Sequence, residues 1–141
     1  MTEDVGIYLS QGKVDFDTIF VGTMMEINSE TISDQFQTTI NGESVKFNFM
    51  PNANLNEHLR GFIGYVTSLN DKPSVKNEAI RLIRQTKAVL GLEYNGAFNK
   101  NPDVWENVLK ISELFDGFVF TYNSIYLSSG AVLIGPMKKG T

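Results

Sequence analysis

The chain has 141 residues, of which 42% are apolar and 20% are charged, and it contains no cysteine. This balance is typical of a globular domain rather than of a disordered chain, and the length is close to the commonest domain size. The lack of cysteine excludes disulfides, thiolate nucleophiles and thiolate metal sites. We therefore expect a single domain over residues 1–141, with a frayed tail at 137–141.

Two further features favour the cytoplasm as the location. The first ten residues carry Glu3 and Asp4 and lack the basic and long apolar regions of a secretory signal. No apolar run approaches the roughly 20 residues that cross a bilayer. We expect a cytoplasmic protein that has no membrane partner.

Charge is distributed unevenly along the chain, whose formal net charge is -4. Residues 1–70 hold nine acidic and three basic residues, whereas residues 71–141 hold seven acidic and nine basic ones. In the second half Arg81, Arg84 and Lys87 recur at a spacing of three, with no aromatic residue among them. Such a stripe is typical of the solvated side of an amphipathic helix, so it argues against nucleic-acid binding.

The first half of the chain predicts three strands. Residues 17–27 are mostly apolar and rich in β-prone types, which favours a strand. Apolar residues then alternate at period two over 36–40 and over 45–49. Between these runs stands Asn41-Gly42, the strongest short signal for a β-hairpin.

Apolar residues at helical spacing predict three helices. The first follows Asn54, a good N-cap with Glu57 at the capping-box position. The second follows Ser74, and the third begins at Asn101-Pro102, a cap followed by a first-turn proline.

The remaining strands are predicted over 88–94 and 118–122, followed by a last hairpin from 125–127 and 131–134. With this hairpin counted as one element, the order is β-β-β-α-α-β-α-β-β. A strand, helix and strand in succession form a right-handed crossover when the two strands are parallel, as we expect over 88–122. The prediction is an α+β fold with a mixed β-sheet and helices packed on one face.

Candidate catalytic residues are scarce. His58 is the one histidine, so neither a histidine metal cluster nor a catalytic triad has partners at a recognisable spacing, and we interpret it as a surface or cap-region side chain. Gly61 and Gly64 lie inside a helical pattern, which favours close helix packing over a phosphate-binding loop. We expect no catalytic residue, no metal site and no cofactor.

The strand ends offer a candidate ligand site. In parallel α/β units ligands gather beyond the carboxyl ends of the strands. Here those ends carry Glu93, Tyr94, Asn95, Tyr122 and Asn123. The start of the third helix should open on the same edge. These residue types are also common in ordinary turns, so both interpretations stay open.

Four segments of the chain resemble a known family. They are FNFMPN at 47–52, LRGFIGYV at 59–66, IRQTKAVLGLEY at 83–94 and DGFVFTYNSIYLSSGAVL at 116–133. In this order they are similar to the amino-terminal region of an uncharacterised bacterial family of unknown function, over about residues 45–134. The resemblance implies the order of helix, strand and closing hairpin, and it implies no activity. The chain resembles a stand-alone version, without the larger carboxy-terminal region that often follows in that family.

Two classes of function follow. A fold without catalytic residues must act by its surface, so we expect a non-catalytic protein-interaction or regulatory module, such as an immunity-type or phage-encoded inhibitor. The alternative is a small-molecule binder or hydrolase that uses a strand-end pocket around Glu93, the one obvious acid or base in that cluster.

The last hairpin is the predicted interaction edge. It carries apolar residues on both alternating faces, at Ile125, Tyr126, Leu127, Val132 and Ile134. An exposed edge of this kind invites pairing with another chain, so we expect a protein partner or a dimer. The opposite interpretation, in which the chain's own helices cover both faces, stays open.

Overall fold

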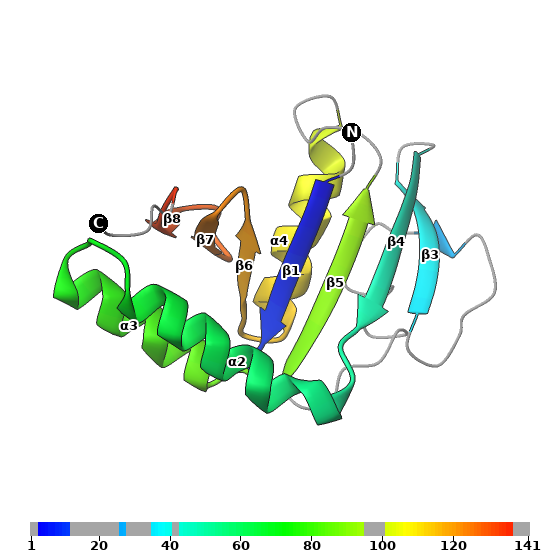
Figure 1. Cartoon of the computed structure of the whole chain (residues 1–141). Helices are drawn as coiled ribbons and strands as arrows, with labels where there is room; N and C mark the ends of the chain where they lie inside the picture. Colours follow the sequence, from blue (N-terminus) through cyan, green and yellow to red (C-terminus); the bar gives the residue numbers. More distant parts are fainter. Residues whose placement is uncertain (1–2, 12–25, 28–34, 41–42, 95–100, 137–141) are drawn as a thin grey trace.

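The structure is a computed structural model that describes residues 3–11, 26–27, 35–40, 43–94 and 101–136. These residues form one eight-stranded sheet and three helices, which confirms the predicted α+β class (Figure 1). The strands are β1 (Glu3–Leu9), β2 (Glu26–Ile27), β3 (Gln35–Ile40), β4 (Glu43–Phe49), β5 (Ala88–Tyr94), β6 (Phe118–Thr121), β7 (Ser124–Leu127) and β8 (Val132–Ile134). The helices are α2 (Asn52–Thr67), α3 (Pro73–Arg84) and α4 (Pro102–Leu114).

The strand that the sequence did not predict, β1, lies near the middle of the sheet. The spatial order is β2-β3-β4-β5-β1-β6-β7-β8, and β1 is antiparallel to both β5 and β6. The strands β5 and β6 therefore run parallel to each other, but they are not neighbours. Every pairing of the described strands is antiparallel, so the predicted mixed sheet is wrong, because β1 separates the two strands of the crossover unit.

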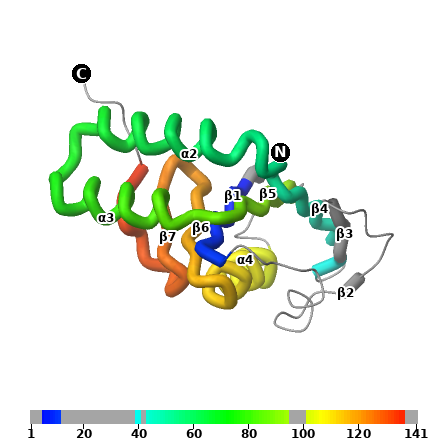
Figure 2. The backbone as a smooth tube through the Cα atoms, turned by 90° about the horizontal axis from the view of Figure 1, so that it is seen from below, coloured from blue at the N-terminus to red at the C-terminus, as the bar shows by residue number. Residues whose placement is uncertain are grey.

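Helices cover both faces of the sheet, which corrects the prediction of helices on one face. Figure 2 shows α2 and α4 on opposite sides of the strands. Successive side chains of a strand point to opposite faces, so Ile7 packs in the core with α4 while Tyr8 packs in the core with α2 and α3. We call these the α4 face and the α2–α3 face.

The predicted first hairpin is confirmed. The strands β3 and β4 pair in register from Gln35 with Asn48 to Ile40 with Glu43. The two residues that join them, 41–42, lie outside the described residues, and so does the predicted tail at 137–141. Most of the strand predicted over 17–27 also lies outside them, and its last two residues form β2.

A tight turn joins β6 to β7 and ends β6 one residue earlier than predicted. Tyr122 and Asn123 have φ angles of 52° and 54°. Thr121 pairs with Ser124, so these two residues form a two-residue turn that needs positive φ at both positions. Beyond β7, the pairing with β8 confirms the predicted last hairpin.

Two of the predicted helix caps are wrong. The helix α2 starts at Asn52 with Pro51 as its N-cap, because the carbonyl of Pro51 already accepts the backbone N–H of Asn54, at 3.0 Å. The helix α3 starts at Pro73 rather than after Ser74, because a proline in the first turn has no N–H that needs a partner. The predicted start of α4 at Pro102 is confirmed.

The predicted apolar stripes form the buried sides of the helices. The buried apolar residues are Leu59, Phe62 and Val66 in α2, Ala79 and Ile83 in α3, and Val104, Val108 and Ile111 in α4. Gly61 and Gly64 are exposed, and a Cβ built at either would meet nothing within 4 Å. Close helix packing therefore does not explain these two glycines.

We predict that Gly117→Ala lowers the free energy of unfolding by about 1–3 kcal/mol, the usual cost of overpacking. Gly117 precedes β6, and a Cβ there would overlap the backbone carbonyl oxygen of Tyr8 in β1. Chemical denaturation measures the change. In the matched control Gly64→Ala the new methyl group enters open space inside a helix, so stability should rise by up to about 1 kcal/mol. Wild-type stability in Gly117→Ala would contradict the close approach of β6 to β1.

Candidate functional site

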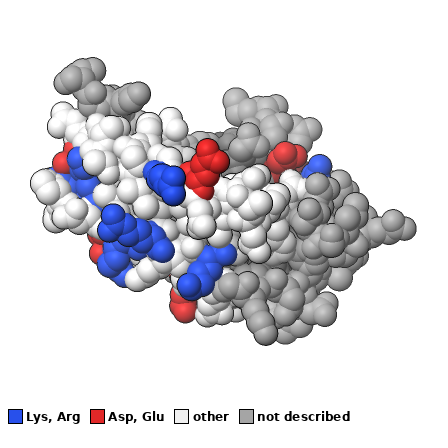
Figure 3. Space-filling model, turned by 60° about the horizontal axis from the view of Figure 1, so that its bottom comes forward, with Lys and Arg blue, Asp and Glu red and all other residues white. Residues whose placement is uncertain are grey.

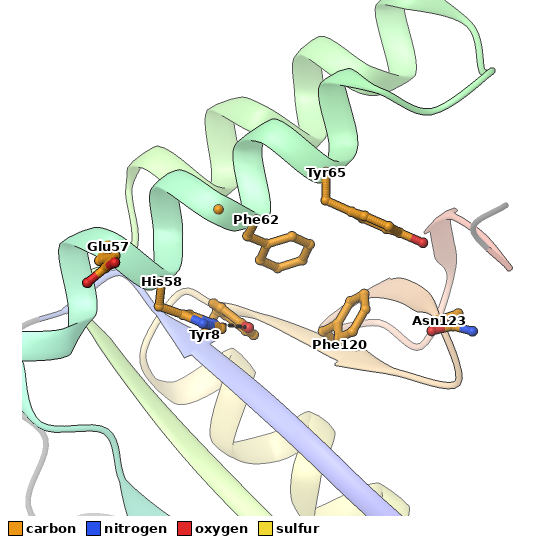
Figure 4. Close-up of a pocket in the computed structure, with 8 residues that line it drawn as sticks. Tyr8, Glu57, His58, Phe62, Tyr65, Phe120 and Asn123 are labelled. Atoms are coloured by element: carbon orange, nitrogen blue, oxygen red, sulfur yellow. Dashed lines mark hydrogen bonds between the residues drawn. The ribbon is translucent and has the colours of Figure 1, made fainter. Parts of the chain in front are cut away.

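An aromatic pocket lies between α2 and the sheet. Its volume is about 540 Å³. Four elements line it: β1, α2, β6 and the β6–β7 turn (Figure 4). The lining residues are Tyr8, Glu57, His58, Gly61, Phe62, Tyr65, Phe120 and Asn123.

Tyr8 forms the floor of this pocket because its neighbours hold the ring in place. The ring lies over Gly6, where a Cβ would come within 2.8 Å of Cε1 of Tyr8, so the glycine leaves the space that the ring needs. The ring of Phe118 stacks on it, with centroids 4.8 Å apart and planes at 9°. Tyr8 is only 5% exposed.

The hydroxyl of Tyr8 shares a hydrogen bond of 2.7 Å with Nε2 of His58. A buried hydroxyl without a partner would cost about 1–3 kcal/mol, so His58 removes this penalty. Burial raises the pKa of the Tyr8 hydroxyl well above its ordinary value, so the group stays protonated at neutral pH. His58 was expected at the surface, but it is partly buried because it reaches this hydroxyl.

Phe62 stands at the centre of the aromatic group. Its centroid lies 5.3 Å from that of Tyr8 and 5.0 Å from that of Phe120, with interplanar angles of 58° and 71°. Rings that meet at such angles form walls of different orientation rather than a closed stack. The space beside them is therefore bounded by ring surfaces on more than one side.

Polar groups stand around this apolar space. Figure 4 shows Glu57 at one end of the pocket and Asn123 at the other, with the hydroxyl of Tyr65 directed toward Asn123. Among the described residues, none forms an ion pair or hydrogen bond with the side chain of Glu57, Tyr65 or Asn123; Ser68 bonds only the backbone carbonyl of Tyr65. These three polar groups are thus available to a ligand.

The predicted strand-end residues do not form one site. Glu93 is exposed on β5, Tyr94 is buried on the α4 face, and Asn95 lies outside the described residues. Tyr122 is 50% exposed in the β6–β7 turn. Asn123, in the same turn, is the one described member of the predicted set that lines the aromatic pocket.

Tyr94 instead belongs to a polar cluster on the other face. Its hydroxyl donates a hydrogen bond to Oε2 of Glu43, and Nδ2 of Asn101 donates to the same oxygen at 3.2 Å. Nδ2 of Asn101 also donates to the carbonyl of Ile40, at 3.1 Å. The cluster thus ties the β3–β4 hairpin to the end of β5 and the start of α4.

This cluster shifts two pKa values in opposite directions. The hydrogen bond from Tyr94, and then that from Asn101, hold the pKa of the Glu43 carboxyl below its ordinary value. Burial, and then the bond to Glu43, raise the pKa of Tyr94. The folded state therefore favours ionised Glu43 beside neutral Tyr94.

The predicted interaction edge is mostly covered by the chain itself. Ile125 and Ile134 are 0% and 3% exposed and belong to the core of the α2–α3 face. Tyr126 and Leu127 are partly buried, and the ring of Trp105 in α4 meets that of Tyr126 at 5.0 Å. Val132, on the edge strand β8, is 52% exposed.

Basic side chains do not form a continuous track on the helical side of the molecule. In Figure 3 the side of α2 and α3 is turned toward the reader, and Lys and Arg stand in groups separated by uncharged surface. Arg81 is engaged by Glu78, with a hydrogen bond of 3.0 Å from its Nε.

Two other features are absent from the part of the chain that the structure describes. It contains no group of three or more His, Asp or Glu side chains that could hold a metal ion. None of its helices is long and apolar enough to span a membrane.

Sequence reasoning missed the aromatic pocket because its walls come from distant parts of the chain. Tyr8 and His58 are 50 positions apart. The available signal was the alternation of Val5, Ile7 and Leu9 with Gly6 and Tyr8, which is typical of a strand with a second, partly aromatic face. Recognising that strand would have brought Tyr8 against the predicted helix that carries His58.

We predict that the free energy of unfolding falls as the pH drops below about 4.5, the ordinary pKa of the Glu43 carboxyl. A carboxyl whose pKa folding lowers stabilises the fold above its unfolded pKa and loses this contribution as the pH falls through the folded pKa. Glu43→Gln removes this titration, so the variant should lose less stability between neutral and acid pH. Urea denaturation across the pH series measures it, with Glu106→Gln, an exposed site on α4, as the matched control. Parallel profiles for wild type and Glu43→Gln would refute the coupling.

Comparison of the chain with protein-family models, with curated proteins and with solved structures gives no significant match. The resemblance of residues 45–134 to a family of unknown function therefore stays a prediction.

Proposed function

We propose that the protein is a non-catalytic binding module whose ligand is a small molecule held in the aromatic pocket. The observation that carries this proposal is the pocket's composition, with ring-lined walls and free polar groups at both ends. Its volume of about 540 Å³ falls in the range of small-molecule sites, roughly 300–1,000 Å³, which are mostly apolar with a few placed polar groups.

The chemistry of the Tyr8–His58 pair favours binding over catalysis. Nε2 of His58 is engaged by the Tyr8 hydroxyl, at 2.7 Å. Because burial raises the pKa of Tyr8, that hydroxyl is a poor nucleophile and a poor proton acceptor at neutral pH. The pair serves better to fix α2 on the sheet than to attack a substrate.

The proposal departs from the strand-end pocket around Glu93. Glu93 is exposed on β5 and does not line the aromatic pocket. Its register partners are Asp4 on β1 and Lys46 on β4.

Titration with indole, a neutral aromatic probe, tests the pocket. We predict that amide signals of α2 and of the β6–β7 turn shift together in NMR spectra. Gly61→Leu adds a side chain at the pocket lining where a Cβ meets open space, so it should weaken binding by roughly tenfold, or about 1.4 kcal/mol.

The matched control is Gly64→Leu, which makes the same change one helical turn further along α2, where the residue does not line the pocket. It should bind indole like the wild type. Equal binding by both variants, or shifts elsewhere in the chain, would show that the pocket is not the site.

A second candidate function is self-association through β8. This strand ends the sheet at one side, and Val132 exposes 52% of its surface there. An edge strand with an apolar side chain in water can pair with the same strand of a second copy. The short length of β8, three residues, limits this pairing to a few backbone hydrogen bonds.

We predict a concentration-dependent increase in mass for the wild type in light scattering, and a loss of this increase in Val132→Lys. A lysine on an edge strand opposes pairing because its charge would have to leave water. Asn77→Lys, on the exposed side of α3, is the control and should associate like the wild type. A monomeric wild type at every concentration would rule out association through β8.

A further inference from the structure

We infer that the ligand of the aromatic pocket is a small organic cation with an alkylated ammonium group, of the size and kind of choline. The inference rests on the proposed function, because it assigns a ligand class to the same pocket. Three features of the lining carry it: the orientation of the rings, the sign of the charge and the placement of the neutral polar groups.

The rings favour a cation. The face of an aromatic ring carries partial negative charge and attracts an ammonium group within about 6 Å of its centroid. Phe62 meets Tyr8 and Phe120 at interplanar angles of 58° and 71°, and Tyr65 adds a further ring from α2. Rings at such angles present surfaces of different orientation to the space beside them, so an ammonium head in the pocket can lie against more than one ring.

The charge in the pocket has the sign that a cation needs. Among the described residues of the lining, Glu57 alone carries a carboxylate and none is a Lys or Arg. The carboxylate of Glu57 is exposed and forms no ion pair with any described residue. Nε2 of His58, the one histidine of the chain, shares a hydrogen bond with the Tyr8 hydroxyl. An anionic ligand would find no Lys or Arg side chain among the described residues of this lining.

The far end of the pocket suits a neutral polar tail. The hydroxyl of Tyr65 and the side-chain amide of Asn123 lie at the end opposite Glu57 (Figure 4). Together they offer hydrogen-bond donors and acceptors to a hydroxyl or carbonyl group. The volume of about 540 Å³ accommodates a whole small molecule of this kind, so we assign a free ligand rather than the side chain of a protein partner.

The test compares choline with 3,3-dimethylbutan-1-ol, which has the same shape but carries no charge. Dissociation constants come from NMR titration of the full chain. We expect choline to bind roughly tenfold more tightly, because cation–π attraction and the carboxylate act on the charged head alone. Similar affinities for the two probes would overturn the inference.

Two variants test whether the preference for choline over the alcohol arises in the aromatic pocket. Glu57→Gln should weaken choline binding severalfold and leave binding of the alcohol unchanged, whereas Glu106→Gln, on α4 outside the pocket, should alter neither. Tyr65→Leu keeps an apolar side chain but removes a ring, so it should reduce the preference for choline. An unchanged preference in both Glu57→Gln and Tyr65→Leu would show that the cation binds elsewhere.

The indole titration separates the two proposals. If indole binds in the pocket but choline does not, the binding module stands and the assigned ligand class is wrong. If indole, choline and the alcohol all fail to bind, both proposals are wrong. A peptide with trimethyllysine forms the last arm, and binding of this peptide more tightly than choline would overturn the assignment of a free small molecule.

Discussion

The burial of the Tyr8 side chain between β1, β6 and α2 is the constraint on which the rest of the structure depends. Its ring occupies the space that a side chain at Gly6 would fill, and it stacks on the ring of Phe118 from β6. Its hydroxyl would be costly to bury alone, and the bond to His58 removes that cost. One side chain thus contacts the neighbouring strand β6 and, through His58, the helix above the sheet, so a shift of α2 relative to the sheet would break these contacts.

The aromatic pocket is a consequence of the burial of Tyr8 and of its hydrogen bond to His58. α2 is held to the sheet through His58 and Leu59 near its start and through Val66 near its end. Between these contacts Phe62 and Phe120 meet edge to face, at 71°, rather than stacking. An edge-to-face pair is favourable for the two rings. The space that remains beside them is mostly apolar because rings line it.

Much of the fold could be predicted from local signals, and the rest depended on contacts between distant residues. The β3–β4 hairpin and the apolar stripes of the three helices follow from period and turn chemistry, which neighbouring residues determine. The strand β1 is different. Its glycine, Gly6, weakens the local signal for a strand, and the strand is stabilised by its pairing with β5 and β6, which are distant in the sequence. Without β1 the crossover strands seemed to be neighbours, and the sheet was predicted as mixed. The candidate site was unpredictable for the same reason, since its floor is Tyr8.

The two glycines of α2, Gly61 and Gly64, lower the stability of the helix. A glycine inside a helix costs roughly 0.5–1 kcal/mol relative to alanine, and close packing repays this at neither Gly61 nor Gly64. At Gly61 the missing side chain leaves the pocket larger, because the side chain of a larger residue there would lie in the pocket lining. Nothing in the structure explains Gly64. The two positions therefore differ although neither glycine meets a neighbour: at Gly61 the missing side chain leaves open a space in the pocket lining, and at Gly64 it does not.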